Sequence, residues 1–304
     1  MEESVDRFLA MQVFVAVGEA QGFAAAARRL GMSPPAVTRT ISALEQQLSV
    51  KLLQRTTRIV RLTEAGSRYL LDCKRLLAEV EDAEQSLSGA QGELRGQVSL
   101  TASIMFGRLF VAPVLLDFLG LHPQVTGRAV LSDRIVDLIE EGLDVGVRIA
   151  HLSDASFTAI RVGAVREVVC ASPAYLKEHG VPRVPKDVSD YDAVTFSHDR
   201  AAPTWSLRDG KQTVAVRPRS RMLVNSSEVA VQAAIDGRGI TRALSYMVAA
   251  EVKARRLRVI LSDFEPEPLP IHVIHHEGKR AAARVRAFVD YVVERLRGNP
   301  LLKA

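Results

Sequence analysis

The sequence predicts an all-α N-terminal domain, then a linker helix, then an α/β domain made of two lobes. Short helical stripes of apolar residues fill the first part, a heptad-like repeat follows, and strands then alternate with helices. At 304 residues and 47% hydrophobic content, the chain is long and apolar enough for two or three cores. The expected bounds are 1–62, 63–90 and 91–304, with lobe one at 96–165 and 269–297 and lobe two at 166–268.

The N-terminal part is expected to hold three helices. Apolar residues crowd one face of 6–19, an Ala-rich stretch covers 23–30, and Gly31 supplies the turn where a left-handed residue costs least. Ser33 should cap the third helix, because Pro34 and Pro35 occupy first positions at which a missing N–H costs little. Its inward stripe is Val37, Ile41, Leu44 and Leu48. Helix, tight turn and helix in this order predict a helix-turn-helix.

The outward face of the third helix is small or basic, as suits a helix in the major groove of DNA. Arg39 is the expected contact to a base edge or a phosphate, and Thr38 can donate to a phosphate. The segment KLLQRTTRIVRLT predicts a two-stranded ribbon with a basic tip, which completes a winged helix-turn-helix. The candidate DNA-binding residues are Ser33, Pro35, Thr38, Arg39, Ser42, Arg55, Thr56 and Arg58.

Positive charge is concentrated in the same segment. The whole chain has a formal net charge of +5. Within 22–62, the Lys and Arg residues are balanced by a single acidic residue, Glu45. A solvated basic face is the alternative, but so one-sided a segment is more typical of a surface that contacts phosphates. Double-stranded DNA is therefore the expected partner.

The linker helix is expected to begin after Thr63, which can cap it. Apolar residues then recur at alternating spacings of four and three, which predicts a heptad seam for a homodimer. The alternative is a helix that packs against its own domain, with Leu70 and Leu77 supplying the contact. A disulfide sensor at Cys73 is disfavoured in a reducing cytosol. The predicted seam is Tyr69, Cys73, Leu76, Val80, Ala83 and Leu87.

The C-terminal part has a βαβαβ rhythm, with helices expected at 106–119 and 134–141 between strands. A second series has helices at 174–179 and 228–235, and the chain ends on an amphipathic helix at 279–297. Ligands of such sheets lie beyond the carboxyl ends of strands, near helix N-termini. Two polar clusters occur there, and ordinary helix caps are the alternative explanation for both. They are Thr101, Ala102 and Ser103 in lobe one and Asn225, Ser226 and Ser227 in lobe two.

The sequence lacks the motifs of enzymes, metal sites and membrane proteins. No catalytic motif of the GxSxG, HExxH or GxxxxGK[ST] type occurs, so we expect neither an enzyme nor a cofactor. His275 and His276 are adjacent on a predicted strand and would point to opposite faces, so no metal site is expected. Cys73 and Cys170 have no CxxC partner. The acidic start MEESVDRF and the lack of a long apolar run predict a cytoplasmic protein without membrane contact.

The stretches FAAAARRLGMSPPAVTRTISALEQQLSVKLLQRTTRIVRLTEAG and VVCASPAYL resemble the LysR-type transcriptional regulators, and the resemblance runs nearly end to end. It implies a winged helix-turn-helix homodimer, usually assembled into a homotetramer, that binds dyad-symmetric promoter sites and responds to a small-molecule effector. It also implies a periplasmic-binding-protein-like effector domain, whose lobes are joined by strands that cross near 163–167 and 266–270. Pro34 stands where many members carry a polar residue, often Gln, so base recognition there is steric or shifted to Arg39.

Two arginines are candidates for an effector's counter-charge. Arg242 follows a glycine turn after which the family usually has apolar residues, so it suggests an anionic effector or an ion pair between lobes. Arg148 ends a strand, and a salt bridge to Asp133 or Asp137 is equally expected. Phe196 and Trp205 could line the cleft, although a lone Trp is more often in a core. A solute-binding protein and a DNA-binding architectural protein without an effector are the alternative functions.

Overall fold

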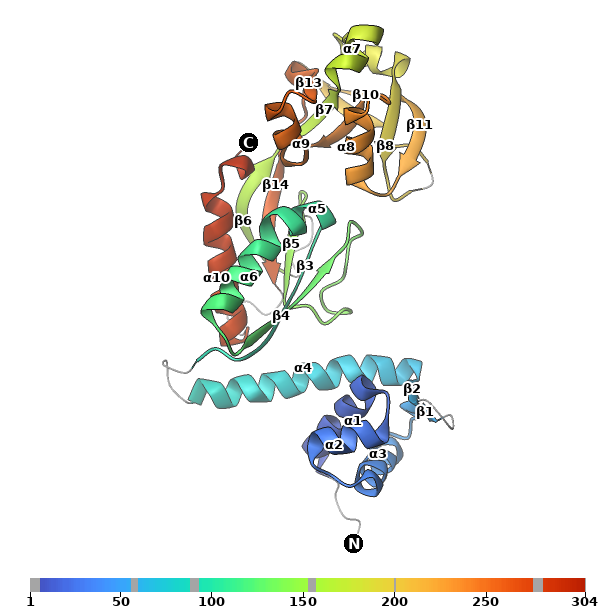
Figure 1. Ribbon diagram of the computed structural model, residues 1–304. Coiled ribbons are helices and arrows are strands. Elements are labelled where there is room, and N and C mark those ends of the chain that lie inside the picture. Colours follow the sequence, from blue (N-terminus) through green and yellow to red (C-terminus); the bar gives the residue numbers. More distant parts are fainter. Residues whose placement is uncertain are drawn as a thin grey trace. The chain divides into compact units, whose positions relative to one another are not determined.

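The computed structural model describes residues 6–55, 60–87, 93–152, 157–199, 201–275 and 281–303, and the chain divides near Glu93 into two compact units (Figure 1). In the first unit, Asp6 caps a helix by accepting hydrogen bonds from the N–H groups of Phe8 at 3.0 Å and Leu9 at 3.3 Å. Gly31 has the left-handed φ of +64° that the turn requires. The elements are α1 (Arg7–Ala20), α2 (Phe23–Leu30), α3 (Pro34–Leu48), β1 (Leu53–Arg55), β2 (Val60–Leu62) and α4 (Glu64–Leu87).

The predicted winged helix-turn-helix is confirmed in this unit. Strands β1 and β2 pair antiparallel, with Leu53 opposite Leu62. The Ser33 hydroxyl accepts a hydrogen bond from the Ala36 N–H at 3.4 Å and caps α3 as expected. The core is built from the inward faces of the three helices and from the start of the wing. Its fully buried members include Val13, Phe14, Val17, Val37, Ile41 and Leu44.

The linker helix α4 divides its predicted seam between two environments. Tyr69 and Cys73 pack in the core of the same unit, and the rings of Tyr69 and Phe14 lie 5.5 Å apart. Leu76 and Val80, one and two turns further on, are exposed at 36% and 38%. The side chains of Ala83 and Leu87 lie outside the described residues. The first part of the seam therefore packs against its own domain, and among the seam side chains that the structure describes, Leu76 and Val80 are open to a partner.

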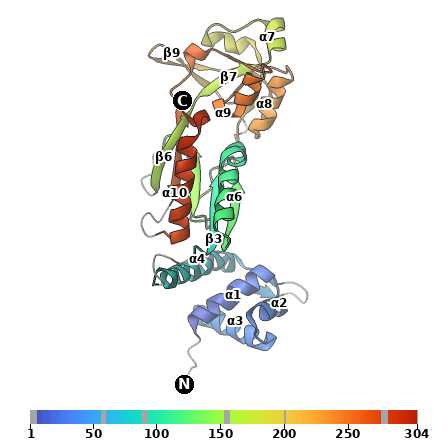
Figure 2. The same cartoon turned by 60° about the vertical axis from the view of Figure 1, so that its left-hand side comes forward.

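The second unit contains a five-stranded sheet in the order β4-β3-β5-β14-β6. Strand β3 pairs parallel to β4 and β5, and β14 pairs antiparallel to β5 and β6. Helices α6 and α10 lie side by side (Figure 2), and the rings of Phe118 and Phe288 meet between them at 5.2 Å. The elements are β3 (Gly96–Ala102), α5 (Ile104–Phe106), a π-helical turn (Gly107–Val111), α6 (Ala112–Leu121), β4 (Val125–Leu131), β5 (Val145–Ile149), β6 (Thr158–Val165), β14 (Leu269–His275) and α10 (Ala283–Gly298).

The rest of this unit is built on a three-stranded sheet, β12-β7-β13, and a parallel pair, β11-β8, that a bridge between Ala193 and Ile240 joins to it. Trp205 is 1% exposed in its core, so the lone tryptophan is a core residue. The elements are β7 (Glu167–Ala171), α7 (Pro173–His179), a 3-10 turn (Pro185–Asp190), β8 (Asp192–Phe196), β9 (Trp205–Asp209), β10 (Gln212–Val216), β11 (Arg219–Val224), α8 (Ser227–Ile235), β12 (Thr241–Leu244), α9 (Ser245–Lys253), β13 (Arg258–Ile260) and 3-10 turns at Ser262–Phe264 and Pro300–Leu302.

Two adjacent chain segments link the sheets of the second unit. The chain passes from β6 to β7 through Arg166 and returns into β14 just after Glu265, and Leu269 pairs with Val165. An ion pair joins the two passages, with Arg166 Nη1 2.9 Å from the Glu265 carboxylate. These passages lie close to the positions expected from the sequence.

The expected helix at 134–141 is absent, and this prediction was wrong. The segment forms turns in which side chains take the bonds that a helix would use: the Arg134 N–H donates to Ser132 Oγ at 3.1 Å and the Ile139 N–H to Asp137 Oδ1 at 2.8 Å. Leu138, with 1% exposure, is held in a small core with Leu143 and Ile274. Of the apolar residues in this segment, Leu138 alone is buried, whereas Ile135 and Ile139 are 89% and 57% exposed, so the apolar spacing does not mark the buried face of a helix.

One helical stretch among the described residues, Ile104–Leu121, is long and apolar enough to cross a membrane by length and composition. A single stretch of this kind is weak evidence, because the core helix of a soluble protein has the same properties. Here Phe106, Val111 and Phe118 lie in the main core of the second unit.

The start of α4 approaches the wing so closely that only glycine fits at position 66. A Cβ atom there would lie 2.0 Å from the Leu52 carbonyl oxygen. Gly66→Ala should therefore lower the free energy of unfolding by at least about 2 kcal/mol, measured by urea titration with circular dichroism. In the control Gly22→Ala, the new Cβ would meet its nearest atom at 3.6 Å, so a change within about 1 kcal/mol is expected. Equal stability of Gly66→Ala and the wild type would contradict the close approach.

Candidate functional site

The outward face of α3 is open to solvent, as the sequence predicted. Ser33, Pro35, Arg39 and Ser42 are exposed, and Thr38 is half-buried. Arg39 has neither an ion pair nor a hydrogen bond with any described residue, so its guanidinium is available to a ligand. The Thr38 hydroxyl donates to the Pro34 carbonyl at 3.0 Å, so it is left to accept rather than to donate a further bond.

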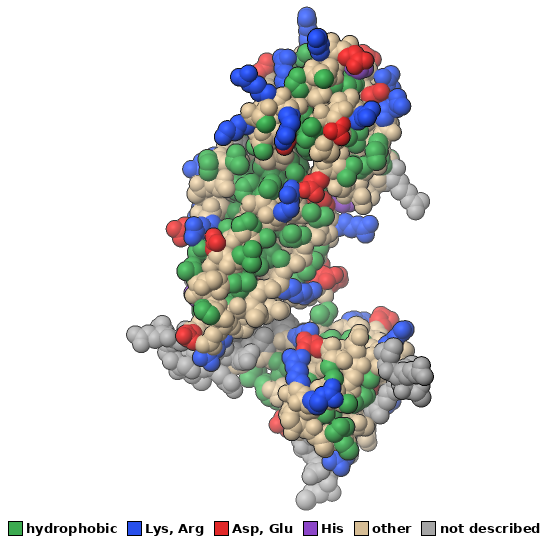
Figure 3. Space-filling view, viewed as in Figure 1, with side chains coloured by type: hydrophobic (Ala, Val, Ile, Leu, Met, Phe, Trp, Pro, Cys, Tyr) green, Lys and Arg blue, Asp and Glu red, His purple; other side chains and the backbone are tan. Residues whose placement is uncertain are grey.

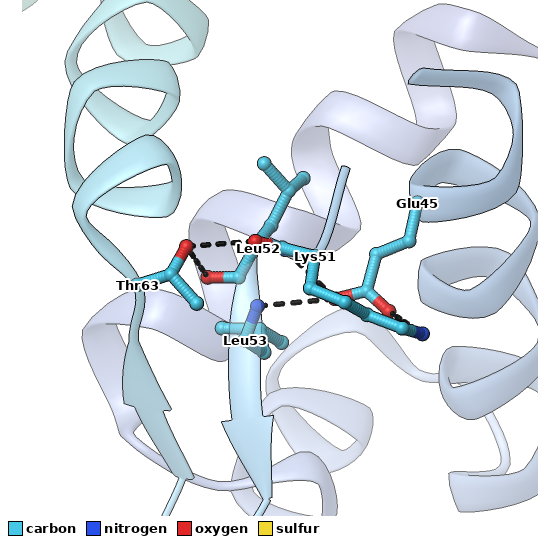
Figure 4. Close-up of polar contacts among 5 residues, drawn as sticks. All are labelled: Glu45, Lys51, Leu52, Leu53 and Thr63. Carbon is cyan, nitrogen blue, oxygen red and sulfur yellow. Dashed lines mark hydrogen bonds and ion pairs between the residues drawn. The ribbon is translucent and has the colours of Figure 1, made fainter. Parts of the chain in front are cut away.

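The inner end of α3 carries a residue whose role the sequence did not reveal. Glu45 is only 3% exposed although it lies in the basic segment. Its Oε1 atom accepts hydrogen bonds from the N–H groups of Leu52 at 2.9 Å and Leu53 at 3.0 Å, and Oε2 lies 2.7 Å from Lys51 Nζ (Figure 4). Burial acts to raise the pKa of Glu45, but the bonds from Lys51, Leu53 and Leu52 outweigh it and hold the pKa below its ordinary value.

Leu52 is also held from the side of the linker helix. The Thr63 N–H donates to the Leu52 carbonyl at 2.9 Å, and the Thr63 hydroxyl lies 2.8 Å from the Lys51 carbonyl oxygen (Figure 4). The same hydroxyl accepts from the Gly66 N–H at 2.9 Å and so caps α4. The peptide groups before and after Leu52 are therefore bonded to α3 on one side and to α4 on the other.

The wing itself is described only at its base. Arg55 ends β1, and Thr56 and Arg58, two of the candidate contacts, lie outside the described residues. Arg61 on β2 is exposed.

Elsewhere in the unit Glu19 of α1 joins three helices, because its carboxylate lies 2.6 Å from Arg29 of α2 and 2.7 Å from Lys74 of α4. Burial acts to raise the pKa of Glu19, but these two bonds outweigh it and lower the pKa.

In the second unit, the lobe-one cluster lies at the end of β3. Thr101 and Ala102 are buried, and Ser103 is half-buried at the start of the helical stretch without a side-chain cap bond. The carboxylate of Asp133 accepts from the Ile104 N–H at 2.9 Å. The chain's own acid therefore occupies a helix-start donor that was expected to be free for an effector.

The lobe-two cluster borders a pocket of about 410 Å³ beyond the carboxyl ends of the parallel strands β8 and β11. Asn225 is exposed and Ser226 is half-buried, and neither caps α8 through a side-chain bond in the described structure. Phe196, which the sequence suggested as a cleft residue, does not line this pocket; its ring lies 5.2 Å from the ring of His198, which does. The lining residues are Ser197, His198, Asp199, Met222, Leu223, Val224, Asn225, Ser226 and Val229.

The two clusters lie on elements that approach each other. Ser227 Oγ at the start of α8 is 3.9 Å from Met105 Sδ, and Arg108 pairs with Glu228 at 2.6 Å. The Tyr246 ring packs edge-on against Phe106 at 5.3 Å. The five-residue π-helical turn that carries Arg108 is of a kind that often occurs at functional sites.

Both candidate arginines have protein partners. Arg148 Nη2 donates to the Val136 carbonyl at 2.7 Å, and its guanidinium lies 5.6 Å from the centre of the Phe157 ring. Arg242 Nη2 lies 3.7 Å from Glu167 Oε1, on the neighbouring strand of the same sheet, and both side chains are 23% exposed. The pair therefore lies within one lobe.

The cysteines and histidines of the described residues form neither a reactive thiolate nor a metal site. Burial raises the pKa of Cys73 to about 11 and that of Cys170 to about 12, so both thiols stay protonated at neutral pH. Among the described residues, no group of three or more His, Cys, Asp or Glu side chains could hold a metal ion. His275 is buried on β14, and His276 lies outside the described residues.

Sequence reasoning missed several residues of these sites. His198 and Asp199 follow β8 as Asn225 follows β11, so the rule that located one cluster would also have found the other. Asp133 and the Arg108–Glu228 pair gave no signal of this kind, because their partners are distant in the chain.

Comparison with known proteins agrees with this arrangement. Residues 8–67 match the family model described as bacterial regulatory helix-turn-helix protein, lysR family, and residues 91–297 match the LysR substrate binding domain. An HTH-type transcriptional repressor of Pseudomonas aeruginosa is 33% identical over 97% of this chain and 94% of its own length. The HTH-type transcriptional activator AaeR of Escherichia coli is 31% identical over 95% of each chain.

A solved structure shows the same architecture. CrgA, a LysR-type transcriptional regulator from Neisseria meningitidis, superposes with a TM-score of 0.61 at 28% identity, over 96% of this chain and 99% of its own. The relatives are regulators rather than enzymes, and members of the family bind DNA and small-molecule effectors and form oligomers. The chain therefore belongs to the LysR family of transcriptional regulators, with a helix-turn-helix DNA-binding domain and an effector-binding domain.

Proposed function

We propose that this regulator acts in the cytoplasm as a homodimer, or as a homotetramer of such dimers, that binds a dyad-symmetric promoter site. Each protomer contacts one half-site with α3 and its wing, and a small molecule bound in the second unit modulates that binding. The observation that carries the proposal is the division of α3 into two faces. Val37, Ile41 and Leu44 of its inward stripe are fully buried and Leu48 is partly buried, while Arg39 on the outward face is exposed and unpartnered among the described residues.

The DNA contacts follow from this face. Arg39 contacts a base edge or a phosphate, and the exposed Ser33 and Ser42 add neutral contacts. Pro35 lies at the helix N-terminus, where side chains approach the bases most closely. From the wing, Arg55, Thr56 and Arg58 contact phosphates.

Oligomer formation is supported by apolar residues that are exposed on helices. Leu76 and Val80 lie four residues apart on α4 and are open to the helix of a second copy. In the second unit, Leu109, Leu116 and Leu121 are exposed at 40%, 68% and 61% along the 104–121 stretch, and apolar side chains spread over the visible face of that unit (Figure 3). Two separate apolar surfaces on one chain fit a dimer that pairs again.

The effector site combines the pocket beside Asn225 and Ser226 with the lobe-one cluster of Thr101, Ala102 and Ser103, of which Ser103 is the most accessible. Short polar side chains at the pocket and the start of the nine-residue helix α8 provide hydrogen-bond donors there, and Met222, Leu223 and Val229 provide apolar lining. An anionic effector would have to draw Arg242 from Glu167 or Arg148 from the Val136 carbonyl. Of the two, the 3.7 Å pair of Arg242 is the looser contact.

Arg39→Ala is expected to weaken operator binding about ten-fold without changing the unfolding transition, because the side chain projects from α3 into solvent. Binding would be measured by fluorescence anisotropy on an operator selected from a random duplex library. Arg68→Ala is the control, since Arg68 is an exposed arginine of the same unit that pairs with Glu64 on α4. Unchanged affinity in Arg39→Ala would remove the residue from the interface.

Replacing both Leu76 and Val80 by Glu should give monomers, because the dimer contact would bury unpaired charge. Light scattering measures the mass directly, and operator affinity should fall with it. Leu71→Glu is the matched control: Leu71 is 39% exposed on the same helix but lies on its opposite side. A double variant that stays dimeric would show that the dimer is held elsewhere.

Asn225→Ala should abolish the effect of the small molecule on operator binding and leave operator affinity without it within about two-fold of the wild type. The probe is the hit of a thermal-shift screen of small carboxylates against the full chain. Arg242→Ala tests the counter-charge, and Gln212→Ala, which does not border the pocket, is the control. If the effector response survives in both Arg148→Ala and Arg242→Ala, neither arginine is the counter-charge of the effector. If operator binding responds to no small molecule at all, an architectural DNA-binding protein is favoured instead.

A further inference from the structure

The position of Glu45 is unfavourable in two ways, and no contact within α3 compensates for them among its described bonds. It is the single acid of the basic segment 22–62, and a negative charge near a surface that contacts phosphates opposes DNA binding. It is also buried, which is unfavourable for a carboxylate unless it is well bonded. Its side chain bonds to Lys51, Leu52 and Leu53, the residues that lead into the wing.

The wing depends on outside support. Its strands have three residues each, and an isolated two-stranded ribbon is at best marginally stable in water. The bonds from Leu52 and Leu53 to Glu45 fix the start of β1 against α3, and the bond from Thr63 to the Leu52 carbonyl fixes it against α4. The base of the wing is therefore held by side chains of the neighbouring helices.

We propose that Glu45 is a positioning residue for DNA recognition: it holds the wing at one fixed place relative to α3, so that helix and wing contact the same half-site together. A wing that is already in place loses little conformational freedom on binding, and its contacts then contribute fully to affinity. This inference rests on the proposed contacts of α3 and the wing with DNA. Glu45 itself does not touch DNA.

The variants separate the two bonds to the wing from the ion pair. Glu45→Met keeps a side chain of similar size that favours helix but has no acceptor for the Leu52 and Leu53 N–H groups. Glu45→Gln keeps a neutral acceptor and loses only the charge facing Lys51, whose side chain is 77% exposed and contributes little through this pair. We expect Glu45→Met to lower operator affinity about ten-fold and Glu45→Gln to stay within about three-fold of the wild type.

The decisive measurement is a double-mutant cycle on the full chain with the selected operator as probe. In the wild type, Arg55→Ala should weaken binding about five-fold, but less than about two-fold in Glu45→Met, where the wing is no longer held in place. Arg39→Ala should cost the same in both backgrounds, because α3 is intact. Glu19→Ala is the matched control: it removes a carboxylate with two ion pairs from the same unit without touching the wing, so Arg55→Ala should keep its full effect there.

Additive losses for Arg55→Ala and Glu45→Met would overturn the proposal. Should Glu45→Met melt below the assay temperature, Thr63→Val takes its place, because it removes a hydroxyl bond to the same segment from the side of α4; additivity in that cycle overturns the proposal equally. If instead both Arg39→Ala and Arg55→Ala bind the operator like the wild type, the proposed DNA contacts fail first. The two failures are therefore distinguishable.

Discussion

The DNA-binding unit depends on how the segment around Leu52 is held. Its N–H groups bond to Glu45 at the end of α3, and its carbonyl bonds to Thr63 at the start of α4, whose Gly66 leaves no space for a side chain. Three elements with different tasks therefore meet at one stretch of backbone. They are the helix proposed to enter the major groove, the wing and the linker helix. Because backbone groups are bonded on both sides, a shift of one element must be shared by the other two.

The second unit shows a different principle, in which charges are satisfied internally. Asp133 bonds to the helix start beside Ser103, Glu167 pairs with Arg242, and Arg108 pairs with Glu228. At the proposed effector site, a ligand would compete with these contacts or fit between them, so its binding free energy would be the difference between two sets of bonds. A ligand that exchanges such contacts favours one arrangement of the lobes over another, which is how effector binding can change an equilibrium elsewhere in the protein.

Local patterns of the sequence were sufficient where each residue acts within its own turn or strand. Ser33 as a cap, Gly31 in the turn and the stripe of Val37, Ile41 and Leu44 were predicted correctly. The helix expected at 134–141 failed for a local reason, because Ser132 and Asp137 bond to nearby backbone N–H groups. The other errors come from contacts between distant residues. The spacing of Tyr69 and Cys73 suits a seam with another helix, but the three helices in front of them offer a nearer apolar surface. Glu45 and Asp133 look like ordinary surface acids until the fold brings backbone N–H groups to them.

Hydroxyl-radical footprinting of the full chain on its selected operator tests the central claim most directly. Two protomers that each contribute α3 and a wing should protect two half-sites related by a two-fold axis, with centres about one helical turn, or about 10 base pairs, or a multiple of it apart. Each half-site should show a major-groove contact flanked by a protected stretch of backbone. A single protected stretch without two-fold symmetry, or protection that does not depend on sequence, would contradict the account.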